Sequence, residues 1–155
     1  MGLDIVLYKV KGVDSLINDD SSIIDDNGNI VKYYEEVGDW YKCNFVYDFF
    51  LKHIDTDNMY NYVDDNTIDL LISYIKNDLK YIESLCYIDD ILNEDISENI
   101  EKYIDVDKLY LNTRSGFFFG SIKYDKYHVM NLKEVLSDLI NSKEIEGKYY
   151  YHYSY

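Results

Sequence analysis

The chain of 155 residues has no proline, one tryptophan, one arginine and two cysteines. No run of apolar residues approaches the length of about 18 that a membrane span requires, which excludes a transmembrane helix. Cys43 and Cys86 form no CxxC pair, so we expect free thiols in a reducing cytoplasm. The first residues, 1–5, lack a basic segment followed by an apolar core, and we expect no signal peptide.

The motifs of common catalytic and metal sites are missing as well. The sequence contains no GxSxG, P-loop, GxGxxG or HExxH motif, and its three histidines are scattered along the chain. The stretch 25–29 resembles part of a calcium loop, but Ile23 and Tyr34 would stand at the first and last ligand positions. We therefore expect no metal and no cofactor, and the sequence favours a protein that is not an enzyme.

Basic residues are scarce relative to acidic ones. The chain carries 15 Lys and Arg against 30 Asp and Glu, which gives a net charge of −15. Such a surface repels phosphate backbones and anionic lipid head groups, so we expect no direct binding of nucleic acid or membrane. It attracts a basic protein surface and accelerates the encounter with it. The alternative is that the acidic residues serve only solubility.

What the sequence does contain is enough apolar surface for a folded core. Hydrophobic residues make up 47% of the chain and aromatic residues 17%, with 19 tyrosines, which favours one domain over 1–155. Apolar alternation and turn residues predict strands over 3–11, 21–25, 30–34, 109–111, 117–119 and 148–155. The stretches 21–25 and 30–34 read as a hairpin around Asn27-Gly28. Spacings of three and four residues predict helices over 36–53, 66–86, 88–104 and 131–142.

These elements predict an α+β fold. Its sheet is small, mixed or antiparallel, and includes the N-terminal strand and the tyrosine-rich C-terminal strand. About four helices flank the sheet. The alternating tyrosines of the tail suit a core or edge strand, and a dimer or partner interface is the alternative.

The densest charge lies between Glu83 and Asp107, where nine acidic residues and one base, Lys102, give a local charge of −8. On a helix over 88–104, residues four apart share a face and rise about 6 Å, a spacing of the same order as that of phosphates along an extended strand. We interpret this face as a decoy for a basic groove, and the alternative is a solvated helix face. The predicted partner-binding residues are Asp89, Asp90, Glu94, Asp95, Glu98, Glu101, Asp105 and Asp107.

A second candidate site combines the helix predicted over 36–53 with the glycine-containing stretch 114–125. An amide on a buried helix face, such as that of Asn44, needs hydrogen-bond partners. If the two segments converge, they form an aromatic-walled polar pocket that binds or cleaves a nucleotide or nucleotide messenger. The alternative is that these residues are structural. The predicted pocket residues are Trp40, Asn44, Tyr47, Arg114, Ser121, Tyr124 and Asp125.

Four stretches carry a family resemblance. They are MGLDIVLYK at the start, EVGDWYKCN at 36–44, GFFFGS at 116–121 with Tyr124-Asp125, and the tyrosine-rich end. Together they resemble a group of small phage and prophage proteins to which no reaction is assigned. The chain departs from that group at Tyr41 and Tyr47, where its members usually carry Arg and His.

The resemblance implies a phage or mobile-element origin, and small accessory phage proteins often counter host defence. With the acidity, it leads us to expect an anti-defence, anti-CRISPR-like inhibitor in the bacterial cytoplasm. Such an inhibitor binds a basic host protein, a nuclease or another defence effector, as a nucleic-acid mimic. A homodimer is compatible with this expectation.

Overall fold

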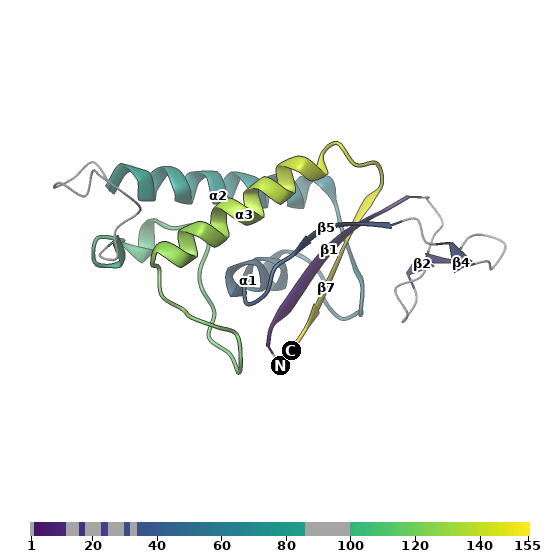
Figure 1. Ribbon diagram of the computed structural model, residues 1–155, viewed down its shortest axis with the longest axis horizontal. Coiled ribbons are helices and arrows are strands. Elements are labelled where there is room, and N and C mark those ends of the chain that lie inside the picture. The colour runs from purple at the N-terminus through teal and green to yellow at the C-terminus, as the bar shows by residue number, and fades with distance from the viewer. Residues whose placement is uncertain (1, 12–15, 18–22, 25–29, 32–33, 86–99) are drawn as a thin grey trace.

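The computed structural model describes residues 2–11, 16–17, 23–24, 30–31, 34–85 and 100–155 (Figure 1). Four antiparallel strands form the main sheet in the order β5-β1-β7-β6. Their bounds are β1 Asp4–Val10, β5 Tyr34–Asp39, β6 Asn61–Val63 and β7 Lys148–Ser154. The α+β class and the pairing of the N-terminal strand with the tyrosine-rich C-terminal strand are confirmed.

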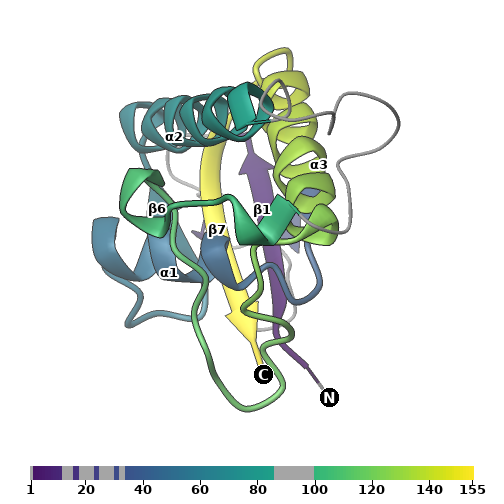
Figure 2. The ribbon, with the colours of Figure 1, turned by 90° about the vertical axis from the view of Figure 1, so that its left-hand side faces the viewer.

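In the part of the chain that the structure describes, three α-helices, against about four predicted, cover one face of this sheet, with the strands behind them in Figure 2. Their bounds are α1 Asn44–His53, α2 Asp65–Leu85 and α3 Lys126–Ser142. Helix α2 buries an isoleucine and leucine stripe, and α3 packs beside it. Helix α1 is buried over most of its length and forms the centre of the core. Within the described chain no helix has the length and apolar character needed to cross a membrane.

The strand pattern explains which side chains reach the core. Ile5 and Leu7 of β1 are buried, and Leu7 lies opposite the buried Tyr151 of β7. Because paired residues of antiparallel strands share a face, these side chains point together toward the helices. Lys9 continues this face, and its ammonium donates hydrogen bonds to the carbonyls of Ser142 and Ile145 at the end of α3.

A second, three-stranded sheet contains β2 Leu16–Ile17, β3 Ile23–Ile24 and β4 Ile30–Val31. The antiparallel pairing of β3 with β4 confirms the predicted hairpin in part. The turn at Asn27-Gly28 lies outside the described residues.

The helix predicted over 36–53 is wrong in its first half. Residues up to Asp39 belong to β5, which pairs with β1, and α1 begins at Asn44. Between the two elements Trp40 folds back over Gly38, where a Cβ would overlap the indole. The apparent helical spacing of Val37, Trp40 and Asn44 therefore spans a strand, a turn and a helix.

The strands predicted over 109–111 and 117–119 are wrong too. The backbone N–H groups of Tyr110 and Leu111 donate to the buried carboxylate of Asp78 on α2, at 2.8 and 3.0 Å. A side chain thus takes the place of a neighbouring strand. In the second stretch Phe119 enters the core, whereas Phe117 and Phe118 are exposed.

Two predicted helices differ from the structure at their ends. The helix predicted over 131–142 begins earlier, because Asp125 caps α3 by accepting the backbone N–H groups of Tyr127 and His128. Most of the helix predicted over 88–104 lies outside the described residues. Its described end holds a short 3-10 helix, η1 Ile100–Lys102, followed by a second, η2 Val106–Lys108.

Candidate functional site

The acidic segment is described only at its end. Asp89, Asp90, Glu94, Asp95 and Glu98 lie outside the described residues. Glu101, Asp105 and Asp107 are exposed, with the exposed Lys102 and Lys108 among them. They are not on one continuous helix, because η1 ends at Lys102 and the Asp105 carboxylate accepts the Asp107 N–H as the cap of η2.

Exposure is the rule for carboxylates across the described chain. Asp48 and Asp78 are the buried ones there. The Asp48 carboxylate contacts both Lys52 and Arg114, at 2.7 and 2.9 Å. The remaining described carboxylates lie at or near the surface.

Asn44 has a structural role. Its side-chain nitrogen donates to the carbonyls of Phe119 and Ser121, at 3.1 and 3.0 Å, and its oxygen accepts the Arg114 N–H at 3.1 Å. The amide thereby fastens the loop before α3 to the start of α1. Such contacts agree with the alternative stated above, that the predicted pocket residues are structural. The Arg114 guanidinium is likewise paired with Asp48.

The predicted aromatic walls belong to the core. The Trp40 indole is 1% exposed and donates to the Asp138 carboxylate on α3 at 2.8 Å. Tyr47 packs edge-on against Phe119 and Tyr153, and burial is the main cause that raises the pKa of Tyr47. The structure therefore does not place Trp40, Tyr47 or Arg114 in a common pocket.

Three of the predicted pocket residues do meet at one cavity. It has a volume of about 130 Å³ and lies between the start of α1 and the N-terminus of α3. Its predicted members are Asn44, Ser121 and Asp125, whereas Tyr124 is not part of the lining and packs its ring against His128. The lining residues are Lys42, Asn44, Phe45, Thr113, Gly120, Ser121, Lys123, Asp125, Tyr127, His128 and Asn131.

Backbone conformation shapes the edge of the cavity where Lys42 and Gly120 meet. Lys42 has a positive φ of 58°, and Gly120 one of 89°. A Cβ at Gly120 would lie 3.0 Å from the Cβ of Lys42, so glycine lets the two segments approach. Sequence reasoning missed both Lys42 and Lys123, although they lie within the stretches 36–44 and 114–125 that it singled out.

His128 is the buried ionisable group of the cavity wall. The ring is 5% exposed and packs edge-on against Phe45 and Tyr124, with centroid distances of 5.2 and 5.1 Å. Its Nε2 has no hydrogen-bond partner among the residues that the structure describes. Burial lowers the pKa of His128 to about 4 against the opposing effect of Asp125, so the ring is neutral at neutral pH.

Other candidate groups are structural. Cys43 is a buried free thiol, and burial with the nearby Glu134 raises its pKa to about 12, so it remains protonated. The Tyr149 hydroxyl forms a buried hydrogen bond with the Ser142 hydroxyl at 2.6 Å. In the part of the chain that is described, no three His, Cys, Asp or Glu side chains gather where a metal ion could bind.

Comparison of the chain with protein-family models, with curated proteins and with solved structures finds no match.

Proposed function

We propose that this chain is an acidic inhibitor of phage or mobile-element origin. It binds a basic surface on a host protein that handles nucleic acid, such as a defence nuclease, and prevents that protein from engaging its substrate. The inhibitor acts by occupation, as a nucleic-acid mimic, and not by catalysis. The observation that carries the proposal is the excess of surface carboxylates.

That excess follows from counting charges. If each of the 15 Lys and Arg residues formed an ion pair with its own carboxylate, 15 of the 30 carboxylates would still lack a basic partner. Asp48 already takes two bases, Lys52 and Arg114, which increases the number left over. Because the described carboxylates other than Asp48 and Asp78 are not buried, the surplus supports an outward-facing negative field.

A basic groove built for phosphates responds to such a field. Electrostatic attraction raises association rates from about 10⁵–10⁶ to as much as about 10⁸–10⁹ M⁻¹s⁻¹ at low salt. The gain falls steeply as salt is added. Binding to the partner is therefore expected to compete with nucleic acid and to weaken with ionic strength.

The test begins by capturing host proteins on the tagged full chain and identifying them by mass. A captured protein supports the proposal only if it binds nucleic acid through a basic surface and is displaced by a DNA competitor. Affinity for that protein is then measured at several salt concentrations. A partner with no basic surface, or one unaffected by DNA and salt, contradicts the proposal.

Two charge-matched variants locate the interface. The first neutralises the acidic segment with E94Q, E98Q, E101Q and D107N, and leaves the Asp105 cap intact. The second neutralises four exposed carboxylates elsewhere, with D4N, E35Q, E144Q and E146Q. We expect the first variant to bind at least about tenfold more weakly than the second. Equal affinities would show that the acidic segment is not the docking surface.

A further inference from the structure

The cavity between α1 and α3 differs in charge from the rest of the surface. Lys42 comes from the turn before α1 and Lys123 from the loop before α3, and both line it. We propose that this cavity binds the phosphate group of a nucleotide, with the two lysine ammonium groups as its cationic partners. This site consists of other residues than the proposed acidic docking surface, and its ligand has the opposite charge to the proposed protein partner.

Local charge favours an anion. The two lysines face one carboxylate, Asp125, whose Oδ1 accepts the Tyr127 and His128 backbone N–H groups at 3.1 Å each. His128 is neutral and adds no charge. At physiological ionic strength the Debye length is about 8 Å, so carboxylates farther than this from the cavity contribute little to its potential.

The polar lining also supplies hydrogen-bond donors. The Ser121 hydroxyl oxygen accepts the Lys123 N–H at 3.1 Å, which leaves the hydroxyl hydrogen to donate elsewhere. The half-buried amide of Asn131 lines the same space and carries two further donor hydrogens. Asn44 holds the loop in place with its own groups already bonded. Phosphate oxygens are acceptors only, and this set of donors complements them.

Size restricts the ligand to one buried group. A volume of about 130 Å³ is smaller than the roughly 300–1,000 Å³ of sites that enclose a drug-sized ligand, so the cavity takes a group of the size of a phosphate and not a whole nucleotide. The remainder of the ligand therefore extends over the rim. Tyr127 lines the cavity and is 61% exposed, so its ring offers a surface on which a base can stack.

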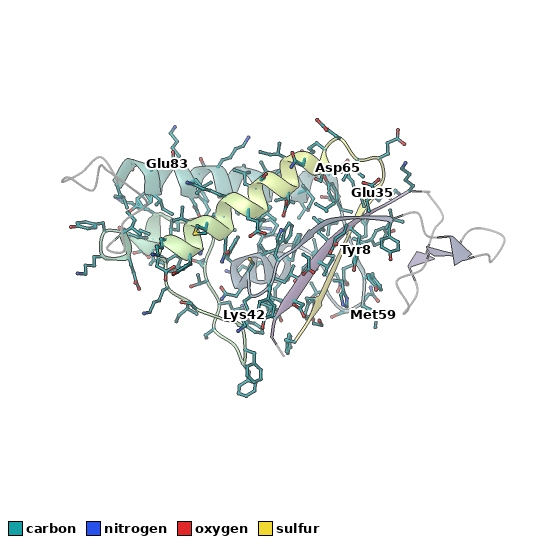
Figure 3. The ribbon with its side chains drawn as sticks, viewed as in Figure 1. Tyr8, Glu35, Lys42, Met59, Asp65 and Glu83 are labelled. Atoms are coloured by element: carbon teal, nitrogen blue, oxygen red, sulfur yellow. The ribbon has the colours of Figure 1, made fainter. Side chains whose placement is uncertain are left out.

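The two proposals use different residues. In Figure 3, Lys42 lies in the lower half of the view and Glu83, on α2, lies in the upper half. The variants that test partner binding leave Lys42 and Lys123 unchanged, so the two proposals are tested separately.

The test is an NMR titration of the full ¹⁵N-labelled chain with inorganic phosphate, a nucleoside 5′-monophosphate and the matching nucleoside. We expect saturable shifts at the amides of Lys42, Ser121 and Asn131 with both phosphate-bearing probes at millimolar concentration, and tighter binding of the nucleotide. The nucleoside alone should not saturate. If inorganic phosphate binds as tightly as the nucleotide, the ligand is the free anion and the stacking role of Tyr127 is overturned.

Variants separate a built site from general attraction. K42M and K123M keep the apolar stems and should each weaken nucleotide binding about tenfold or more. K76M, on an exposed position of α2, removes the same charge elsewhere and should leave the affinity within about twofold. Amide spectra of each variant report folding directly. No saturable shift at these amides in the folded wild-type chain, or equal effects of K123M and K76M, overturns the proposal.

Discussion

His128 links pH to the stability of this fold. Its ring is buried between Phe45 and Tyr124, and its Nε2 has no partner among the described residues. Burial lowers its pKa from 6.5 to about 4, so the folded chain holds this imidazole neutral where the unfolded chain protonates it. Replacing it by phenylalanine, as H128F, keeps an aromatic ring of similar shape and removes the titration.

The magnitude follows from the two pKa values. Between pH 6.5 and 4 the unfolded chain binds more protons at this residue than the folded chain, so the free energy of unfolding falls as the pH falls. A difference of about 2.5 in pKa, at 1.36 kcal/mol for each unit, gives about 3 kcal/mol over the whole range. By pH 5 the loss is about 2 kcal/mol.

The assay is urea unfolding of the wild type and H128F at pH 7 and pH 5, followed by the fluorescence of Trp40, the single tryptophan, which is 1% exposed. The pH dependence of the wild type alone is not diagnostic, because burial raises the pKa of Asp78 and that carboxyl acts in the opposite direction. The stability difference between the two proteins cancels this common contribution.

We expect H128F to gain about 2 kcal/mol relative to the wild type between pH 7 and pH 5. The matched control is H53F, which changes an exposed histidine on α1 and should leave the difference nearly constant. Parallel pH profiles for wild type and H128F would refute the reasoning, since they would mean that the folded state accommodates a charged His128.

Two other buried polar groups give further predictions. D78A leaves two backbone N–H groups of the 109–111 segment without their acceptor and should lower the free energy of unfolding by about 3 kcal/mol, whereas the exposed N77A should change it by less than about 0.5 kcal/mol. K9M removes the ammonium that binds two carbonyls at the end of α3 and should cost about 1–2 kcal/mol. Thermal unfolding checks the K9M prediction, because each kcal/mol lost lowers the Tm by about 2–4 °C. The control is K133M, which changes an exposed lysine and should leave the Tm nearly unchanged.

The sequence predicts the parts of this fold that repeat a simple period. Helix α2 is predicted over 66–86 and observed over Asp65–Leu85, because Ile68, Leu71 and Ile75 repeat every three or four residues on its buried face. The first and last strands are also found, since alternation over seven residues is a strong signal. In the helix and in the two strands, the pattern that predicts the element lies within the element's own residues.

The errors arise where a distant group decides the local structure. The 109–111 segment has the composition of a strand, but the Asp78 carboxylate satisfies its backbone from α2. The start of α3 is set by Asp125, whereas the predicted start at residue 131 lies inside the observed helix. Strand β6 has only three residues, which is too short for a pattern to register.

The cavity was predictable only in part. The sequence leaves open whether Asn44, Ser121 and Asp125 converge, and in the structure all three line one cavity, with the Asn44 amide bonded directly to the loop carbonyls. The two lysines could not be found, since nothing near Lys42 in sequence indicates that it meets Lys123. Their meeting depends on the close approach of Lys42 to Gly120, which exists only in the folded chain.

A cavity that binds phosphate and an acidic surface can coexist on one small protein when the ligand of the cavity is short. A duplex of ten base pairs extends about 34 Å, several times the Debye length of about 8 Å. A polymer bound at Lys42 and Lys123 would therefore extend past the cavity into the field of the surplus carboxylates, whereas a single phosphate group experiences mainly the lining. Under the two proposals, the acidity that attracts a basic protein therefore also excludes nucleic-acid strands from the cavity proposed to bind a mononucleotide. This selection of a mononucleotide over a strand requires no base-specific contact, because the length over which the ligand carries negative charge is sufficient to distinguish the two.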